Sequence, residues 1–425
     1  MSYVLFGVFV ALVMLNVPIA VSLGLATLSA IFISQTVPLM VVAQKMFSAT
    51  DSFPLMAIPF FMIAGALMEK GGISKRLIHL ANAVIGSLSG GLALVTVVAS
   101  MFFAAISGSA PATVAAIGSL MIPAMVRQGY NQNFATATQA SSGYIGVIIP
   151  PSIPMITYGV VTGASIGKLF MAGLIPGLIM GLALMIVAYV TSRKRGYVGS
   201  GQASLKESFI AFKDAILALL MPIIILGGIY GGVFTPTEAA NIAVVYGAII
   251  SFFVYKELSL KDIPEILRIS AINSSMVMLL IATATAFGLL LTREQIPDAI
   301  ASFFIQMTDN PLILLLAINL MLLFIGTFLE TNAAIIILAP IFYPVIVKMG
   351  IDPVHFGIVM VINLAIGMIT PPLGVNLFVA CGITKIKIEQ VIRANWMYFF
   401  ISLLALALLT YVPAITLFLP DLLGN

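Results

Sequence analysis

Two polar segments interrupt an otherwise apolar sequence, ISGSAPAT at 106–113 and IGTFLETNAA at 325–334. A double proline follows each of them, at 150–151 and at 371–372. Hydroxyl and carbonyl oxygens, which such segments offer, are the ligands that hard cations such as Na⁺ prefer. Residues and motifs typical of enzyme catalysis are scarce, because the sequence holds two histidines, one cysteine and neither an HExxH nor a GxSxG motif. We therefore expect ion or solute binding and no catalysis.

The composition places these segments in a membrane. Hydrophobic residues make up 61% of the chain and charged residues 8%, against roughly 25% charged in soluble domains. Apolar runs reach the ~20 residues that cross a bilayer as a helix, so the sequence predicts an all-α polytopic membrane protein. The net charge of +4 is too thinly spread to indicate nucleic-acid binding. The run 4–34 lacks the basic region of a signal peptide and is interpreted as a retained first span.

The double prolines belong to an internal repeat. The pattern P-x-x-V-[KR]-x-G-x16-G-x3-P-P fits both 123–151 and 344–372, at a constant offset of 221 residues. Chance is a poor explanation for seven matched positions with identical spacing. We therefore interpret the chain as two homologous halves joined across roughly 193–235.

Each half carries two interruptions. The polar segments lie between apolar stretches of about 12–15 residues, shorter than a full span, and are interpreted as tips of re-entrant hairpins. Such backbone is tolerated at membrane depth only beside protein or a water-filled cavity. The prolines predict broken helices over 132–163 and 353–383, with carbonyls near 146–150 and 367–370 left without helical partners. Free carbonyls suit Na⁺ and free N–H groups suit anions, although a simple proline kink is the alternative.

Counting the hairpins as non-crossing gives nine predicted spans, which are 4–34, 54–69, 132–163, 167–192, 215–233, 236–256, 272–292, 353–383 and 388–410. Fifteen of the 19 Lys and Arg residues then lie on one face. The positive-inside rule makes that face cytoplasmic, with the N-terminus inside and the C-terminus outside. The second repeat is then inverted relative to the first. Four more segments are predicted to be helices along the interface, 37–50, 73–86, 259–271 and 297–308.

Inverted repeats with discontinuous helices are typical of secondary transporters. The hairpin tips, the two G-x3-P-P breaks and GGVFTPTEAANIAVVYG at 231–247 resemble the large membrane subunit of TRAP transporters, the tripartite ATP-independent periplasmic transporters. The resemblance covers essentially the whole chain. It implies a Na⁺-driven symporter of the bacterial inner membrane, in contact with lipid, that works with a small membrane subunit and a periplasmic substrate-binding protein. The whole sequence is similar to sialic-acid members, with C4-dicarboxylates and other sugar acids left open as substrates.

The resemblance also implies an elevator mechanism. The transport domain would consist of 87–166 and 310–386. The scaffold would consist of 1–86, 167–309 and 387–425.

At least two Na⁺ sites are implied, one at each hairpin tip and break. The first set is Ser107, Gly108, Ser109, Gly146 and Pro150, and the second is Gly326, Thr327, Glu330, Thr331, Asn332, Gly367, Thr370 and Pro371. The substrate contacts are expected to be Ala110, Pro111, Thr113, Pro151, Ser152, Thr157, Pro372 and Asn376. The alternative for the hydroxyl side chains among them is that they form hydrogen bonds with their own backbone or with a neighbouring helix.

Glu330 has two interpretations. It is either a functional carboxylate inside the membrane or an N-terminal charge on the helix that starts near Asn332. Glu238, in the TPTE stretch, is interpreted as part of a helix capping box and not as a ligand. His355 and Tyr398 are predicted to lie at the interface. A stand-alone symporter or channel of similar architecture is the alternative function, and an intramembrane enzyme is the weakest one.

Overall fold

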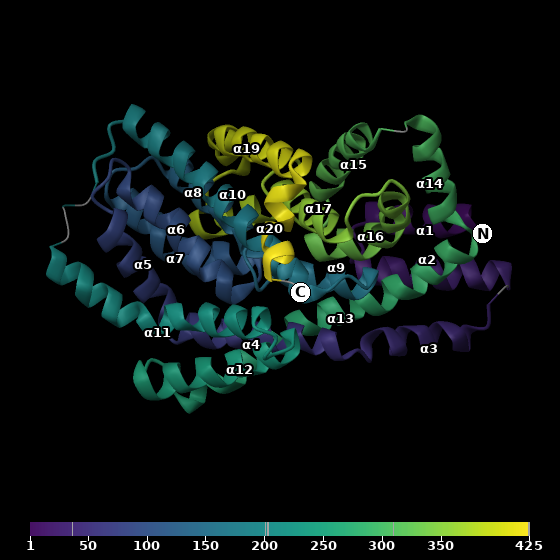
Figure 1. Cartoon of the computed structure of the whole chain (residues 1–425), viewed down its shortest axis with the longest axis horizontal. Helices are drawn as coiled ribbons and strands as arrows, with labels where there is room; N and C mark the ends of the chain where they lie inside the picture. The colour runs from purple at the N-terminus through teal and green to yellow at the C-terminus, as the bar shows by residue number, and fades with distance from the viewer. Residues whose placement is uncertain (36, 200, 202–203, 309, 424–425) are drawn as a thin grey trace.

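The computed structural model describes residues 1–425 except 36, 200, 202–203, 309 and 424–425. The described residues form helices and no strand, and eight of the described helices are long and apolar enough to cross a membrane. The chain is therefore an all-α polytopic membrane protein, as predicted. Figure 1 shows α5 towards one end of the long axis and α1, α2 and α14 at the other end.

The first predicted span is wrong. Residues 4–34 form two helices, α1 (Ser2–Met14) and α2 (Ile19–Ser34), which pack against each other as a hairpin. Asn16 adopts a left-handed conformation and Pro18 caps α2. Asparagine tolerates that conformation and proline cannot continue a preceding helix, so LNVP ends one helix before the next begins.

This hairpin changes the expected position of the N-terminus. Ser2 Oγ donates to Glu294 at 2.7 Å, just beyond the end of α13 (Ile263–Arg293). Lys70 pairs with Glu265 in the first turn of α13. A continuous helix of 31 residues is about 46 Å long. The N-terminus and Lys70 therefore lie at opposite ends of α13, and the prediction that placed both on one face is wrong.

The N-terminal region continues with α3 (Leu39–Thr50), η1 (Phe53–Met56), α4 (Ala57–Lys70) and α5 (Ile73–Ile85). The central region comprises α10 (Ile166–Lys194), α11 (Leu205–Tyr230), α12 (Pro236–Ile249), η3 (Ile250–Val254), η4 (Leu260–Asp262), α13 and α14 (Ile296–Met307). The predicted interfacial helix 259–271 is not a separate helix, because all but its first residues belong to α13. The TPTE capping box is confirmed at the start of α12, where the Thr235 side chain accepts from the Glu238 N–H.

The hairpin and broken helix of the first half are formed by α6 (Gly91–Ser107), α7 (Ala110–Arg127), α8 (Gln132–Gly143), η2 (Tyr144–Val147) and α9 (Ile153–Thr162). Those of the second half are formed by α15 (Pro311–Gly326), α16 (Thr331–Lys348), α17 (Pro353–Gly367) and α18 (Val375–Thr384). Both predicted helix breaks are confirmed, and each contains a cis Pro-Pro peptide bond. The hairpin arms are longer than predicted, with 16 to 18 residues each.

The two halves run in opposite directions along α19 (Ile388–Tyr411). Thr138 of α8 bonds Tyr398 of α19, and Tyr144 of η2, directly after α8, bonds Ser402 of α19, both at 2.7 Å, so α8 and α19 run in parallel. The α17 helix runs the other way. His355, near its start, lies 3.2 Å from the Thr410 carbonyl, while Asn395 donates to the carbonyl of Ile369 beyond its end. The inverted repeat predicted from the sequence is thus present in the fold.

The hairpins consequently open to opposite faces. Gln132, just after the first hairpin, donates to the carbonyl of Thr384 before the start of α19. Tyr411, at the other end of α19, donates to the carbonyl of Leu312 at the base of the second hairpin.

The prediction that His355 and Tyr398 lie at the membrane interface is wrong. His355 and Tyr398 are buried, because His355 bonds Thr416 near the start of the last helix, α20 (Pro413–Leu423), and Tyr398 bonds α8.

Candidate functional site

The tip of the first hairpin is built from short hydroxyl side chains. Gly108 adopts a left-handed conformation that ends α6, and Ser109 in extended conformation precedes α7. The Ser107 hydroxyl lies 3.1 Å from that of Thr113, which itself donates to the Ser109 carbonyl at 2.8 Å. The Ser109 side chain makes no cap to α7. The first turn of α7 therefore keeps N–H groups that its N-cap side chain does not satisfy.

This tip is docked on the first helix break. The N–H of Ile153, at the start of α9, donates to the Gly108 carbonyl at 3.3 Å. Gly146 approaches the tip closely, since a Cβ atom there would lie 2.6 Å from the Ser109 carbonyl oxygen. Only glycine fits this contact without a shift of the backbone. The tip and break predicted to share a site are therefore in direct contact.

The tip of the second hairpin carries a carboxylate. Glu330 is the N-cap of α16, and its side chain accepts from the N–H groups of Asn332 at 2.9 Å and Ala333 at 3.2 Å. It also accepts from the Asn332 carboxamide at 2.9 Å. The structure thus has the N-terminal-charge geometry that was one of the two interpretations of Glu330. Its partly exposed carboxylate also lines a cavity, so a second role is compatible with this geometry.

The second tip contacts the second break through glycine. A Cβ atom on Gly367 would lie 2.4 Å from the carbonyl carbon of Gly326, so the two backbones touch. The Thr331 hydroxyl contacts the Met368 sulfur at 3.3 Å. Thr327 and Thr370 bond carbonyls of their own helical segments.

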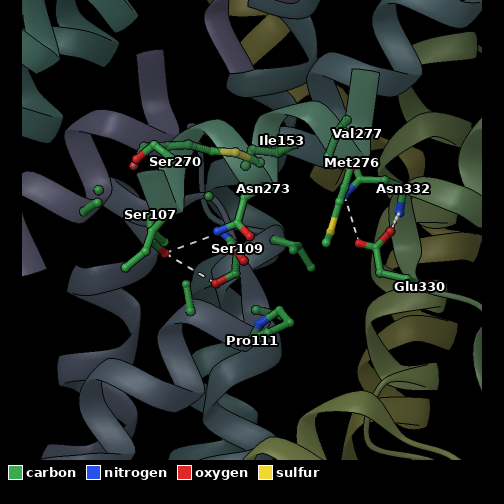
Figure 2. A pocket seen from close by; sticks show the side chains of 18 of the residues that line it. Ser107, Ser109, Pro111, Ile153, Ser270, Asn273, Met276, Val277, Glu330 and Asn332 are labelled. Carbon is green, nitrogen blue, oxygen red and sulfur yellow. Dashed lines mark hydrogen bonds between the residues drawn. The ribbon is translucent and has the colours of Figure 1, made fainter. Parts of the chain in front are cut away.

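The second tip bonds the first half of the repeat. The Thr157 hydroxyl of α9 donates to the Asn332 carboxamide oxygen at 3.1 Å, which joins the first half to the second. Beside this contact lies a cavity of about 490 Å³. Figure 2 shows the first tip, with Ser107 and Ser109, on one side of it and Glu330 with Asn332 on the other.

Two helices outside the hairpins and the broken helices complete the cavity wall. From α4 come Met62, Gly65, Ala66 and Glu69, and from α13 come Ile269, Ser270, Asn273, Met276, Val277 and Leu280. None of these was identified from the sequence. A signal that could have identified this wall was the carboxamide residue Asn273 within a predicted membrane span. The residues that α13 presents to the tips follow the helical spacing of three and four.

The ionisable side chains that line the cavity are acidic. Glu69 and Glu330 supply carboxylates, whereas no Lys, Arg or His is among the described residues that line the wall. The oxygen donors there are serine hydroxyls, carboxamides and carboxylates, a set that fits a hard monovalent cation. The described residues contain no cluster of three His, Cys, Asp or Glu side chains that could hold a transition metal.

The predicted residues divide into two groups. Ser107, Gly108, Ser109, Ala110, Pro111, Glu330 and Asn332 line the cavity. Thr113, Ser152, Thr157 and Asn376 are fully buried and do not line it. Asn376 donates to the carbonyl of Ala140 on α8, so it stabilises the packing of α18. Pro150 and Pro151 are buried, while Pro371 is half-buried and Pro372 is exposed.

The expectation of free carbonyls at the breaks is wrong at several positions. Val147 O accepts from the Ser152 hydroxyl at 2.6 Å. In the second break, Gly367 O accepts from the Thr370 N–H, Met368 O from the Asn376 N–H and Ile369 O from the Asn395 carboxamide. Polar groups from later in the chain replace the lost helical donors. Each carbonyl oxygen retains a second lone pair.

Comparison with known proteins gives consistent matches. Residues 6–415 match the family described as the DctM component of tripartite ATP-independent periplasmic transporters. The chain is 52% identical to the isethionate TRAP transporter permease protein DctMQ of Oleidesulfovibrio alaskensis, over 98% of the chain and 66% of that longer protein. It is 44% identical to the C4-dicarboxylate TRAP transporter large permease protein DctM of Rhodobacter capsulatus, over 100% of the chain and 99% of the relative.

A more distant relative bears on the substrate. The sialic acid TRAP transporter large permease protein SiaM of Vibrio cholerae is 40% identical, over 98% of both chains. Among solved structures, the YdaH transporter of Alcanivorax borkumensis superposes with a TM-score of 0.65 at 16% identity, over 88% of this chain and 87% of that one. The latter likeness concerns the fold alone.

Proposed function

The chain belongs to the DctM component family of tripartite ATP-independent periplasmic transporters, and from this premise we propose that it is the transport subunit of a Na⁺-coupled importer of small organic anions. The observation that supports this most is that two inverted hairpin tips line one cavity, together with Val147 and Ile153 of the first helix break. Inverted repeats with discontinuous helices place ion and substrate sites near the midplane in secondary transporters.

The family implies a multi-pass protein of the bacterial inner membrane. Its tripartite organisation implies a small membrane subunit and a periplasmic substrate-binding protein as partners. In the proposed assembly the binding protein delivers the substrate, and this chain provides the path across the membrane.

The proposed Na⁺ ligands are the oxygen donors at the two tips. Ser107 and Ser109 would serve one site, and Glu330 with Thr331 and Asn332 the other. The cavity has no cationic side chain among its described lining residues, so an anion there depends on bound cations and helix N–H groups for compensating charge. This dependence is the physical basis of the proposed coupling.

For the substrate, we place isethionate and C4-dicarboxylates ahead of sialic acid. The relatives named for those two compounds are 52% and 44% identical to this chain, against 40% for the sialic acid relative. The three compounds share a carboxylate or sulfonate group, which the open N-terminus of α7 would accept.

We further propose that the two hairpins and the two broken helices move together, in the manner of an elevator, against a scaffold that includes α4 and α13. The cavity lies between the hairpin tips and these two helices, which is where the substrate of a moving domain would meet its fixed wall.

Uptake into proteoliposomes tests the proposal. The complex of large and small subunits, with its binding protein, should accumulate radiolabelled isethionate, succinate or N-acetylneuraminate under an inward Na⁺ gradient. A K⁺ gradient of equal size should give no accumulation. Equal uptake under both gradients would contradict Na⁺ coupling, and uptake by the large subunit alone would favour a stand-alone symporter.

A further inference from the structure

The α13 helix contributes one polar side chain whose position the fold does not explain. Asn273 is exposed, lies among serines on α13 and lines the cavity. Its carboxamide makes no hydrogen bond to any described residue. A polar side chain at this depth in a membrane protein is costly and is usually functional.

The other polar groups of the wall are already engaged. The Ser107 hydroxyl contacts Thr113 and Ser109, and the Asn332 carboxamide uses its oxygen for Thr157 and its nitrogen for Glu330. Ser270 is buried and donates to the Met62 carbonyl. Of the described wall side chains, the Asn273 carboxamide and the Ser109 hydroxyl therefore remain as uncommitted hydrogen-bond donors.

Both side chains line the same cavity. In Figure 2 Asn273 and Ser109 lie in the middle of the view, between Ser107 and Glu330. Ser109 belongs to the first hairpin, while Asn273 belongs to α13, which lies outside the two hairpins and the two broken helices. An anion in the cavity would receive a donor from each.

We propose that Asn273 is a substrate-binding residue that the scaffold donates to the organic anion. The inference rests on the proposed transport function. Because α13 lies outside the proposed moving domain, the contact exists only when the tips stand opposite this helix. Asn273 therefore raises substrate affinity in the conformation described here, and not in one where the tips have moved away.

The position of the cavity along α4 and α13 identifies this conformation. Its wall runs along α13 from Ile269 to Leu280 and along α4 to Glu69, next to Lys70, which pairs with Glu265. The cavity thus extends along α4 towards the face at which Lys70 pairs with the first turn of α13. By the positive-inside rule this face is cytoplasmic, so the contact belongs to the state that releases imported substrate.

Substrate exchange at varied internal concentration tests this. In proteoliposomes that hold the complete complex, Asn273→Ala should raise the apparent KM for internal isethionate or succinate about tenfold, the loss expected for one hydrogen bond to a charged group. The Na⁺ dependence should be unchanged. Asn273→Asp should raise the KM further, because it replaces a donor by a like charge. Asn241→Ala, an exposed asparagine of α12 that does not line the cavity, is the matched control.

A purely structural role predicts a different ranking. If Asn273 only hydrates the cavity, aspartate, which is the same size and more polar, should be tolerated better than alanine. That result, or a KM equal to wild type in both variants, would overturn the proposal. Failure of the wild-type complex to exchange any of the compounds would instead count against the proposed function.

A labelling experiment is independent of transport activity. Cys381 is the one native cysteine, so Cys381→Ser gives a background in which Asn273→Cys or Asn241→Cys can be labelled alone. Isethionate or succinate with Na⁺ should slow maleimide labelling at position 273 several-fold and leave position 241 unchanged. Equal labelling rates at position 273 with and without the compounds would contradict the contact.

Discussion

The two helix breaks have the same sequence motif and different surroundings. Residues 145–152 of the first break are all buried, and the Ser152 side chain caps α9 by accepting from the Met155 N–H. In the second break Pro372 and Leu373 are exposed, and Gly374, in a left-handed conformation without a side-chain cap, starts α18. The inverted duplication has therefore kept the backbone path while one copy became core and the other reached the surface.

The hairpin tips differ in the same way. The arms α6 and α7 pack along each other, whereas α15 packs mainly on α17, and α16 packs on α14 and α9. The first tip leaves the start of α7 without a side-chain cap, and the second caps α16 with Glu330. An anion is accommodated at an open helix start, and a cation beside a carboxylate. One fold unit, used twice in opposite directions, thus presents open helix N–H groups at one tip and a carboxylate at the other.

The largest effect is expected where the backbones touch. In Gly367→Ala the new Cβ meets only backbone atoms of Gly326, at 2.4 to 2.6 Å, so the second tip must move. The cost of such overpacking is about 1 to 3 kcal/mol. Gly146→Ala should cost less, since part of its clash is with the Thr113 side chain.

Thermal unfolding of the detergent-solubilised complex and uptake at matched abundance measure this pair. Gly382→Ala, which meets nothing within 4 Å, is the control and should resemble wild type. A Gly367→Ala protein as stable and active as that control would mean that the second tip is not held by this contact.

The proline pairs test whether the breaks are equivalent. Proline costs about 3 kcal/mol more than alanine inside a helix, so changing Pro371 and Pro372 to alanine should let α17 and α18 approach a continuous helix. Insertion should be normal, because the apolar spans are untouched. Na⁺-driven uptake and stabilisation by Na⁺ should be lost. The same change at Pro150 and Pro151 should act through the other tip, and wild-type uptake in both double variants would reduce the prolines to simple kinks.

The charge difference between the tips should appear in the Na⁺ dependence. Glu330→Gln keeps a capping oxygen and removes the charge, so it should raise the Na⁺ concentration for half-maximal uptake about tenfold, the scale of a lost contact to a charged group. Ser109→Ala should raise it only a few-fold. A larger effect from Ser109 than from Glu330 would reverse the assignment of ligands to the two tips.

The smallest functional effect is expected from cysteines that report sidedness. In a Cys381→Ser background, Arg127→Cys and Lys348→Cys should label from opposite sides of the membrane, since the hairpins open to opposite faces. Tyr3→Cys, at an exposed N-terminal position, should label from the same side as Lys348→Cys. Labelling of positions 127 and 348 from one side would contradict the inverted arrangement, and labelling of position 3 with position 127 would restore the single first span.

The repeat was predictable because its physical causes leave marks in the sequence. Two adjacent prolines break a helix wherever they occur, and Gly146 and Gly367 stand where a Cβ atom would collide with the opposing tip. The N-terminal helix hairpin also has a signal in the sequence, since Asn16 and Pro18 favour the end of one helix and the start of the next. The prediction of a single span gave more weight to the length of the apolar run.

The features that were predicted wrongly or missed depend on tertiary packing, which cannot be inferred from the pattern of a single sequence. His355 and Tyr398 are buried because distant segments supply their partners, Thr416 and Thr138. The wall formed by α4 and α13 was missed because which side of an apolar helix faces the tips is decided by its neighbours. The carbonyls of the second break were expected to be free, and Asn376 and Asn395 satisfy two of them from farther along the chain.

The two carboxylates of the cavity, with no cationic side chain among its described lining residues, have an electrical consequence. An anion that entered alone would be placed among like charges, and in a poorly hydrated site such repulsion is weakly screened. In the proposed transporter the anion would therefore reside only after cations have entered, and it would become unstable once they leave. Leakage of substrate without ions would then be limited by fixed charges of the protein, without the need for a separate gate.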